Sequence, residues 1–282
     1  MKITISAEST IDLPQNLLEK FDIHTTPFTI NLDEQVLHDE QGISSKIYDF
    51  VAKTKTLPKT SAVNQVQFEE HFSSLLKSFD AVVHVSLSSM ISSACQNAIA
   101  AAKNFDNVYV VDSKTLSTGI ALLAIRARNL ADSGLDAKTI ANQIQALTPN
   151  VQAGFILENL QYLYRGGRCT SLALFGANLL KIKPQIIVNE QGKMVLGKKF
   201  IGNFGVCVEK YANQILSDYK NPDLENVFIT HSSPMDEIVQ KLTAKLKERG
   251  FENVYDTFAG GTISSHCGPN CIGILFLNKS QN

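Results

Sequence analysis

The sequence predicts an α/β protein with two parts. A largely parallel sheet is expected in an N-terminal α/β domain, residues 1–152, and a mixed or antiparallel sheet in a C-terminal α+β domain, residues 153–282. In the first half, short apolar runs alternate with amphipathic stretches, which is typical of parallel sheets covered by helices. From about Gln152 the pattern changes, because two extended runs are separated only by Glu190-Gln191-Gly192, a spacing that favours a β-hairpin.

The first half opens as a strand, a helix and a strand. Residues 2–6 and 24–30 are β-rich runs, and Pro14 lies in the first turn of the helix predicted between them. Asn64 is expected to cap a helix in which Phe68 and Phe72 recur at helical spacing. The same alternation then predicts a strand at 81–85, a helix at 92–103, a strand at 107–111, and helices at 118–131 and 137–147.

The second half contains more strands with fewer helices between them. Extended runs are predicted at 153–157, 183–189, 193–200, 226–230, 251–258 and 271–277. A Lys-rich amphipathic helix is predicted at 236–249. If 158–164 is helical, Gly166 and Gly167 would end it and leave Arg168 projecting beyond; a cationic helix C-terminus is the simpler interpretation of that arginine.

Composition and charge exclude several classes of protein. Hydrophobic residues make up 44% and charged residues 19% of the 282, which predicts a folded chain with a sizeable core. The net charge is -1 and no Lys/Arg run occurs, so nucleic acid is not an expected partner. No apolar run has the length of a membrane span, and residues 1–6 are too short for a signal peptide. Scattered cysteines, five in number, favour free thiols and a cytoplasmic location.

Polar residues gather after the apolar strands, where a parallel sheet places its ligand-binding edge. These clusters are Ser6–Thr10, the serines of 86–93, and Asp112-Ser113. They are candidates for binding a small polar group, while helix capping is the simpler interpretation for each serine taken singly. The chain has no G-x-G-x-x-G, no P-loop and no G-x-S-x-G nucleophile elbow, which argues against a dinucleotide site, a P-loop and the common α/β hydrolase.

One segment contains residue types that bind metal ions in other proteins. His266-Cys267-Gly268-Pro269-Asn270-Cys271 has a permissible C-x3-C ligand spacing, but the other histidines and cysteines offer no matching pair. We therefore expect no metal here and predict instead that a Gly-Pro turn presents His266.

Short motifs along the whole chain resemble those of the DegV family of bacterial fatty-acid-binding proteins, and it is their shared order that makes the resemblance specific. Ser9-Thr10-Ile11-Asp12-Leu13 resembles D-S-T-x-D-L, and Thr60-Ser61 resembles the start of T-S-x-P-S. The other matching segments are 86–92 for I-S-S-x-L-S-G-T-Y, 112–119 for D-S-x-x-x-S-x-G, 160–168 for L-x-Y-L-x-K-G-G-R, 180–184 for L-x-I-K-P and 266–269 for H-x-G-P-G.

The resemblance implies a lipid carrier rather than an enzyme. One long-chain fatty acid would occupy an interior tunnel between and within the two domains, with no other cofactor and no metal. A separate kinase subunit would phosphorylate its carboxyl group to an acyl phosphate for phospholipid synthesis, with transient membrane contact as a further expectation. Carried over by position, Thr60, Ser61 and Ser92 would bind the carboxylate, and Arg168 and His266 would lie near the head group or the kinase.

The chain departs from the family pattern at several places. Glu8, Val63 and Arg165 replace Asp, Pro and Lys, changes that we expect to affect loops only. Ser93-Ala94-Cys95 stands in place of Gly-Thr-Tyr, which removes a hydroxyl and an aromatic ring close to Ser92 and predicts altered head-group geometry or chain preference. Asn270 replaces a glycine, and because Asn tolerates a left-handed backbone we expect the turn to survive.

Two other functions stay open. The Ser-rich edge with His266 could form a hydrolase or acyltransferase site, which would need a hydroxyl within hydrogen-bond reach of the histidine. Alternatively, the chain could carry another amphipathic acid, and the ligand that copurifies would distinguish this from a fatty-acid carrier.

Overall fold

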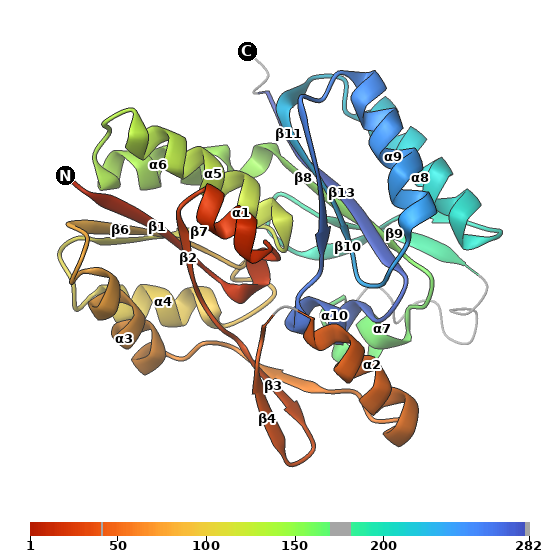
Figure 1. Ribbon diagram of the computed structural model, residues 1–282, viewed down its shortest axis with the longest axis horizontal. Helices are drawn as coiled ribbons and strands as arrows, with labels where there is room; N and C mark the ends of the chain where they lie inside the picture. Colours follow the sequence, from red (N-terminus) through yellow and green to blue (C-terminus); the bar gives the residue numbers. More distant parts are fainter. Residues whose placement is uncertain (41, 170–181, 280–282) are drawn as a thin grey trace.

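A parallel four-stranded sheet forms the first half of the molecule. The computed structural model describes residues 1–40, 42–169 and 182–279. The strand order is β2-β1-β6-β7, and every pair is parallel, as predicted. Helices lie on both sides of this sheet (Figure 1). The elements are β1 (Ile3–Glu8), β2 (Ile23–Thr26), β6 (Ala81–Ser86), β7 (Val108–Asp112), α3 (Gln65–Leu75) and α4 (Ala94–Ala102) on one side, and α5 (Thr118–Asp132) and α6 (Ala137–Leu147) on the other.

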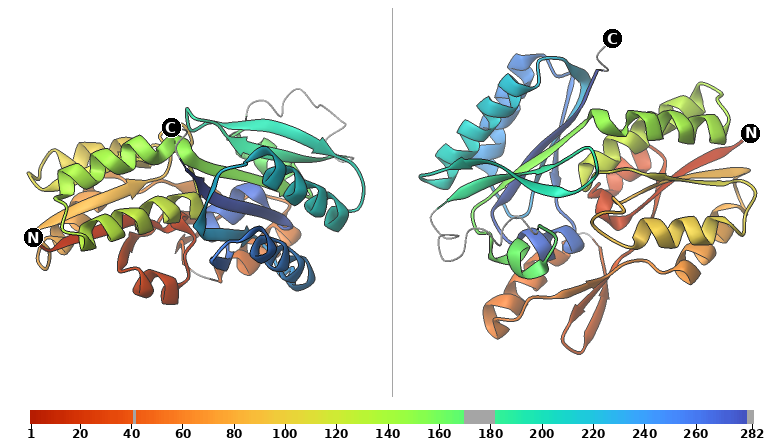
Figure 2. Two further views of the ribbon diagram at one scale, coloured as in Figure 1. Left: turned by 90° about the horizontal axis from the view of Figure 1, so that it is seen from above. Right: turned by 180° about the vertical axis from the view of Figure 1, so that it is seen from behind.

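A mixed six-stranded sheet forms the second half. Its order is β10-β9-β8-β13-β11-β12, in which only β11 and β12 pair in parallel. Two long helices, α8 and α9, lie side by side against it (Figure 2). The elements are β8 (Val151–Leu157), β9 (Lys183–Val188), β10 (Met194–Phe200), α8 (Phe204–Asp218), β11 (Pro222–His231), α9 (Asp236–Arg249), β12 (Asn253–Phe258) and β13 (Cys271–Asn278). The predicted boundary between 152 and 153 falls inside β8 and stays a prediction.

A small third sheet was not expected from the sequence. The single strand predicted at 24–30 is wrong, because the chain divides at Pro27 into β2 and β3. Proline has no N–H for a ladder, so a continuous strand is disfavoured there. β3 pairs with two short strands in the order β4-β3-β5, and the β3–β4 hairpin projects from the molecule (Figure 1). The elements are β3 (Thr29–Leu32), β4 (Gln35–His38), α2 (Ile43–Thr54) and β5 (Lys59–Ser61).

Short helices stand near the junction of the sheets: α1 (Gln15–Lys20), α7 (Gln161–Gly166) and α10 (Gly261–Cys267). Gly167 ends α7 in the left-handed conformation, as predicted. The prediction that a Gly-Pro turn presents His266 is wrong: His266 lies in the last turn of α10, and the turn comes after it. The sequence does not predict this helix because Gly261, Thr262 and the two serines that follow are weak helix formers. Leu180 and Lys181 of the L-x-I-K-P motif lie outside the described residues.

The structure shows the surroundings of Glu8 and Asn270, two positions at which the chain departs from the family pattern. Glu8 does not lie in a loop, so that expectation is wrong: it is a buried residue of β1, where Leu87 N donates to Oε2 at 2.9 Å and His84 Nε2 lies 3.3 Å from Oε1. Burial opposes ionisation, but His84 and the hydrogen bonds outweigh it and lower the pKa of Glu8. Asn270 has a φ of 56°, so it holds the left-handed position of the turn as expected.

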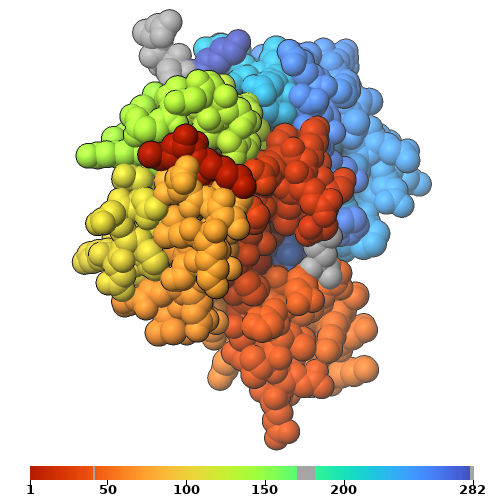
Figure 3. All heavy atoms as spheres, turned by 60° about the vertical axis from the view of Figure 1, so that its left-hand side comes forward, coloured from red at the N-terminus to blue at the C-terminus, as the bar shows by residue number. Residues whose placement is uncertain are grey.

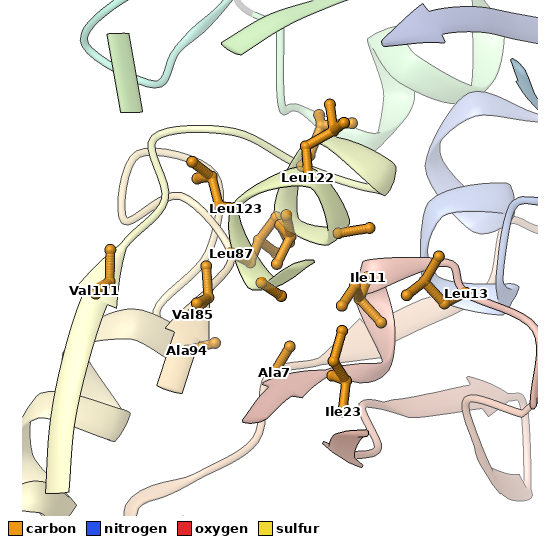
Figure 4. Close-up of a cluster of buried hydrophobic side chains, with 14 of the residues drawn as sticks. Ala7, Ile11, Leu13, Ile23, Val85, Leu87, Ala94, Val111, Leu122 and Leu123 are labelled. Carbon is orange, nitrogen blue, oxygen red and sulfur yellow. The ribbon is translucent and has the colours of Figure 1, made fainter. Parts of the chain in front are cut away.

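One hydrophobic core runs through both large sheets. Figure 4 shows part of it, where Ala7, Val85 and Val111 of three neighbouring strands gather beside Leu123 of α5. The same cluster continues into the six-stranded sheet through buried residues of β8 and β13. A second cluster fills the space between that sheet and helices α8 and α9. The junction between the sheets is therefore packed by a shared core rather than joined by a linker.

Candidate functional site

A cavity of about 550 Å³ lies where the large sheets and the small sheet meet. Its lining comes from the six-stranded sheet, from β5, from the segments after β6 and β7, and from α7 and α10. Four of the five predicted site residues line it: Thr60, Ser92, Arg168 and His266. The volume falls within the range of about 300–1,000 Å³ that is typical of small-ligand sites.

Thr60 and His266 form a direct hydrogen bond across this cavity. The distance from Thr60 Oγ1 to His266 Nε2 is 2.8 Å, and it joins residues 206 positions apart. Burial and, after it, the charge of Arg168 lower the pKa of His266 to about 4, so the ring is neutral at pH 7. If Nε2 carries the proton, it donates to Thr60 Oγ1 and leaves the threonine O–H free to donate to an anion.

Ser92 supplies a second hydroxyl in the cavity wall. Its Oγ accepts a hydrogen bond from Ala94 N at 3.2 Å, so its own proton stays available for a ligand. Ser93 also lines the cavity, whereas Ala94 and Cys95 are buried in the start of α4 and do not. The chain thus keeps a hydroxyl directly after Ser92.

The remaining two predicted residues differ in position. Ser61 does not line the cavity: it is exposed on β5, and its Oγ lies 3.4 Å from Asn31 Nδ2. Neighbouring residues of a strand face opposite sides, so Thr60 and Ser61 cannot both point inward. Arg168 lines the cavity and is exposed, with Nη1 donating to Gly166 O at 2.7 Å. It therefore stands where the cavity meets solvent.

Much of the cavity wall is apolar. Thr230 and Ser232 are polar residues of the wall whose hydroxyls are bonded within the protein. Thr230 Oγ1 lies 2.6 Å from Thr118 Oγ1 and 2.9 Å from Thr257 Oγ1, and Ser232 Oγ donates to Gly268 O at 2.7 Å. The apolar lining side chains are Phe28, Ala62, Leu87, Met90, Ile91, Leu116, Phe155, Leu163, Met194, Ile263 and Leu275.

Two buried carboxyl groups fix the helix that carries His266. Gly260 N donates to Asp12 Oδ1 at 2.8 Å, and Gly261 N donates to Asp39 Oδ1 at 2.6 Å. Carboxyl oxygens satisfy the free N–H groups at the start of α10 and match its dipole. Burial raises the pKa of both Asp12 and Asp39 above the usual value, against the opposing effect of these hydrogen bonds. The sequence motif contains Asp12, but nothing in the sequence indicates its pairing with Gly260.

Glycine lets α7 approach the histidine. A Cβ atom at Gly166 would lie 2.7 Å from His266 Nδ1, closer than side chains pack. That nitrogen is buried and has no hydrogen-bond partner among the described residues. The ring is thus confined between Thr60 on one side and the backbone of α7 on the other.

A second cavity of about 950 Å³ lies on another side of α10. Residues of α1, in red, and of the 38–48 segment, in orange, frame this hollow in Figure 3, and it contains Asp12 and Asp39. None of the five predicted site residues lines it. The residues singled out by the sequence therefore gather in the first cavity.

Two further observations bear on chemistry and location. Within the described ranges, no three His, Cys, Asp or Glu side chains converge as metal ligands would. No helix in the same part of the chain is long and apolar enough to cross a bilayer.

Fold and site together define a class: an α/β protein of two large sheets that encloses a largely apolar cavity with hydroxyl groups in its wall. Within that class the chain belongs to the DegV family, because residues 2–279 match the model of the DegV family of uncharacterised proteins. DegV domain-containing proteins of Clostridium acetobutylicum and Caldanaerobacter subterraneus are 30% and 29% identical to it, and each match covers 99% of both chains.

Solved structures share the fold along the whole chain. A DegV family protein of Thermus thermophilus, described as binding fatty acid, superposes with a TM-score of 0.90 at 25% identity, over 99% of this chain and 100% of that one. DegV of Bacillus subtilis, a fatty acid binding protein, gives 0.85 at 25% identity with the same coverage. The fold predicted from the sequence is thereby confirmed.

Proposed function

We propose that this chain binds one long-chain fatty acid in the first cavity and presents its carboxyl group to a partner kinase for phosphorylation to an acyl phosphate. The observation that carries the proposal is the cavity itself, which is largely apolar and has the residues Thr60 and Ser92 in its wall. Fatty acid binding by the Thermus and Bacillus relatives supports the same ligand. Five buried free cysteines suit a role in the cytoplasm.

The tail supplies the affinity in this proposal. Each buried methylene contributes about 0.8 kcal/mol, so a chain of about sixteen carbons offers on the order of 12 kcal/mol before the losses of association. The apolar part of the wall, where Thr230 and Ser232 are bonded within the protein, is suited to such a tail.

The hydroxyls of Thr60 and Ser92 suit phosphoryl transfer to the bound carboxylate. Thr60 and Ser92 each donate one hydrogen bond, whereas an arginine would clamp both carboxylate oxygens in a bidentate pair. Hydroxyls therefore hold the carboxylate while leaving an oxygen free to attack a phosphoryl donor. Arg168 is exposed where the cavity meets solvent, so a kinase that reaches the carboxylate would meet it first.

Mass spectrometry after denaturing extraction tests the ligand and its contacts. We expect near-stoichiometric fatty acid in the wild type and a marked loss in Thr60→Val with Ser92→Ala. Ser61→Ala is the matched control, because it removes a hydroxyl from the same strand on the face outside the cavity. Unchanged fatty acid in the double variant would refute the head-group assignment, and a different acid in the wild type would indicate a carrier of another amphipathic acid.

The kinase step needs its own assay. With the partner kinase and ATP, the loaded wild type should yield acyl phosphate, and Thr60→Val with Ser92→Ala should not. A loaded protein that no kinase of the source organism phosphorylates would refute presentation while leaving fatty-acid binding intact.

The 2.8 Å contact between Thr60 and His266 also fits a hydrolase or acyltransferase, which needs a hydroxyl beside a base. Two features weaken that function: none of the carboxylates that the structure describes orients Nδ1, and the lowered pKa makes His266 a poor base. Release of product from a p-nitrophenyl ester by the purified protein, lost in His266→Gln, would favour the enzyme over the carrier.

A further inference from the structure

The two cysteines of the C-x3-C segment, Cys267 and Cys271, place their thiols at the ligand cavity. Cys267 and Cys271 both line the first cavity, and both are otherwise buried. Of the five cysteines, only these two are lining residues. Anything small enough to enter the cavity therefore meets a pair of thiols.

A tight turn brings the two thiols together. Cys267 ends α10, Cys271 opens β13, and the backbone reverses between them through the left-handed Gly268 and Asn270. The side chain of Ser232 closes this turn, since its Oγ donates to Gly268 O at 2.7 Å and accepts from Cys271 N at 3.0 Å. Tyr48 Oη lies 3.1 Å from the same Gly268 oxygen. The turn is held from two sides.

The two thiols lie at the two ends of this turn, and Cys267 Sγ is 3.4 Å from Gly268 O within it. Interaction with Cys267, and after it burial, raises the pKa of Cys271 well above the usual thiol value. A disulfide needs two cysteines whose Cβ atoms are held close together, and a short turn fixed from two sides keeps both cysteines in place.

We propose that Cys267 and Cys271 are a redox site in the wall of the ligand cavity, which hydrogen peroxide entering the empty cavity converts to a disulfide. The sulfur of Cys267 attacks peroxide, the O–O bond breaks, and a sulfenic acid and one water form. The sulfur of Cys271 then displaces the sulfenic oxygen, which leaves as a second water with the Cys271 proton. Two thiols are oxidised by two electrons and one peroxide is reduced to two waters.

Ligand occupancy controls this reaction. An acyl chain in the cavity covers both thiols, so only the empty protein is oxidised; this part rests on the proposed function. At a fatty acid concentration about 100 times Kd, about one molecule in a hundred is empty, and the oxidation rate falls on the order of 100-fold.

Peptide mapping tests the proposal. Delipidated and fatty-acid-loaded proteins are treated with hydrogen peroxide, denatured, alkylated and digested with trypsin, which leaves both cysteines in one peptide, residues 250–279. In the delipidated protein we expect this peptide to escape alkylation and to be lighter by two hydrogen atoms. Cys95 and Cys207, buried away from the cavity, should be alkylated as before. Cys271→Ser should stop at a sulfenic acid on Cys267 that dimedone traps.

The outcomes separate this inference from the proposed function. Full alkylation of both thiols in peroxide-treated delipidated protein, or equal oxidation rates with and without bound fatty acid, overturns the redox site. Fatty acid measured in the same samples reports binding separately. A disulfide that forms in a protein with no affinity for fatty acid would leave the redox site standing and refute the carrier.

Discussion

At the scale of single residues, Gly166 is the position where a methyl group changes the site most selectively. Gly166→Ala would place a Cβ atom 2.7 Å from His266 Nδ1, so the ring cannot keep its present position between α7 and Thr60. We expect fatty acid retention to fall several-fold with little change in the free energy of unfolding, measured by mass spectrometry and urea denaturation.

The neighbouring glycine is the matched control. Gly167 has a φ of 70° and open space around its Cα, so Gly167→Ala strains the backbone without touching the histidine. It should lower the free energy of unfolding by about 1–2 kcal/mol while fatty acid retention stays at the wild-type level. The reverse pattern in the two variants would contradict this account of the site.

Partly buried, neutral histidines make stability depend on pH. Burial is the main reason that the pKa is lowered to about 4 in His266 and to about 3 in His71. Their unfolded value is near 6.5, so the folded state binds fewer protons, and stability is full above that pH and lost as pH falls toward 4. For His266 the loss is on the order of 3 kcal/mol.

Urea denaturation between pH 7 and pH 4 measures this effect as a difference between the wild type and His266→Gln. The difference matters because Asp12 and Asp39, with raised pKa values, act in the opposite direction in both proteins. The variant should lose less stability than the wild type as pH falls. Parallel curves would show that the buried state of His266 has no energetic consequence.

At the scale of elements, the short helix α10 depends on its acidic partners. Asp39→Ala leaves Gly261 N–H buried without an acceptor, and we expect a loss of about 1–3 kcal/mol in the free energy of unfolding. Fatty acid retention should fall too, because the helix carries His266. Asp39→Asn keeps an acceptor oxygen and should lie closer to the wild type in both measurements. Wild-type stability and retention in Asp39→Ala would contradict the role given to this carboxyl group.

Elements differ in how well the sequence predicts them. Helix α9 was predicted at its observed bounds because its apolar residues recur at helical spacing and Gly250 stops it. β4 was missed since most of its side chains are exposed, so no alternation marks it. α10 was missed because packing against α2 and α7 stabilises it in spite of poor propensity.

At the scale of the whole molecule, the shared core predicts cooperative unfolding. Buried residues of β1, β6, α5, β8 and β13 belong to one cluster, so neither half can lose its packing alone. We expect a single thermal transition with the same midpoint by far-UV and near-UV circular dichroism. Residues 1–152 expressed alone should not fold stably. Two separated transitions would instead support independent domains divided near residue 152.

The candidate site shows where sequence reasoning stops. Family motifs identified Thr60, Ser92, Arg168 and His266, all of which line one cavity. They also included Ser61, because a motif does not tell which face of a short strand a residue occupies. The carboxyl groups that hold α10 and the interaction between Cys267 and Cys271 depend on tertiary packing that no local pattern encodes.

The contact between Thr60 and His266 also determines when, during synthesis of the chain, the cavity is complete. It joins positions 206 residues apart, and β13, which completes the cavity wall, is the last strand of the described chain. A nascent chain on the ribosome has no closed cavity until β13 is synthesised. Under the proposed function, fatty acid can therefore be captured only by a chain in which β13 has been synthesised.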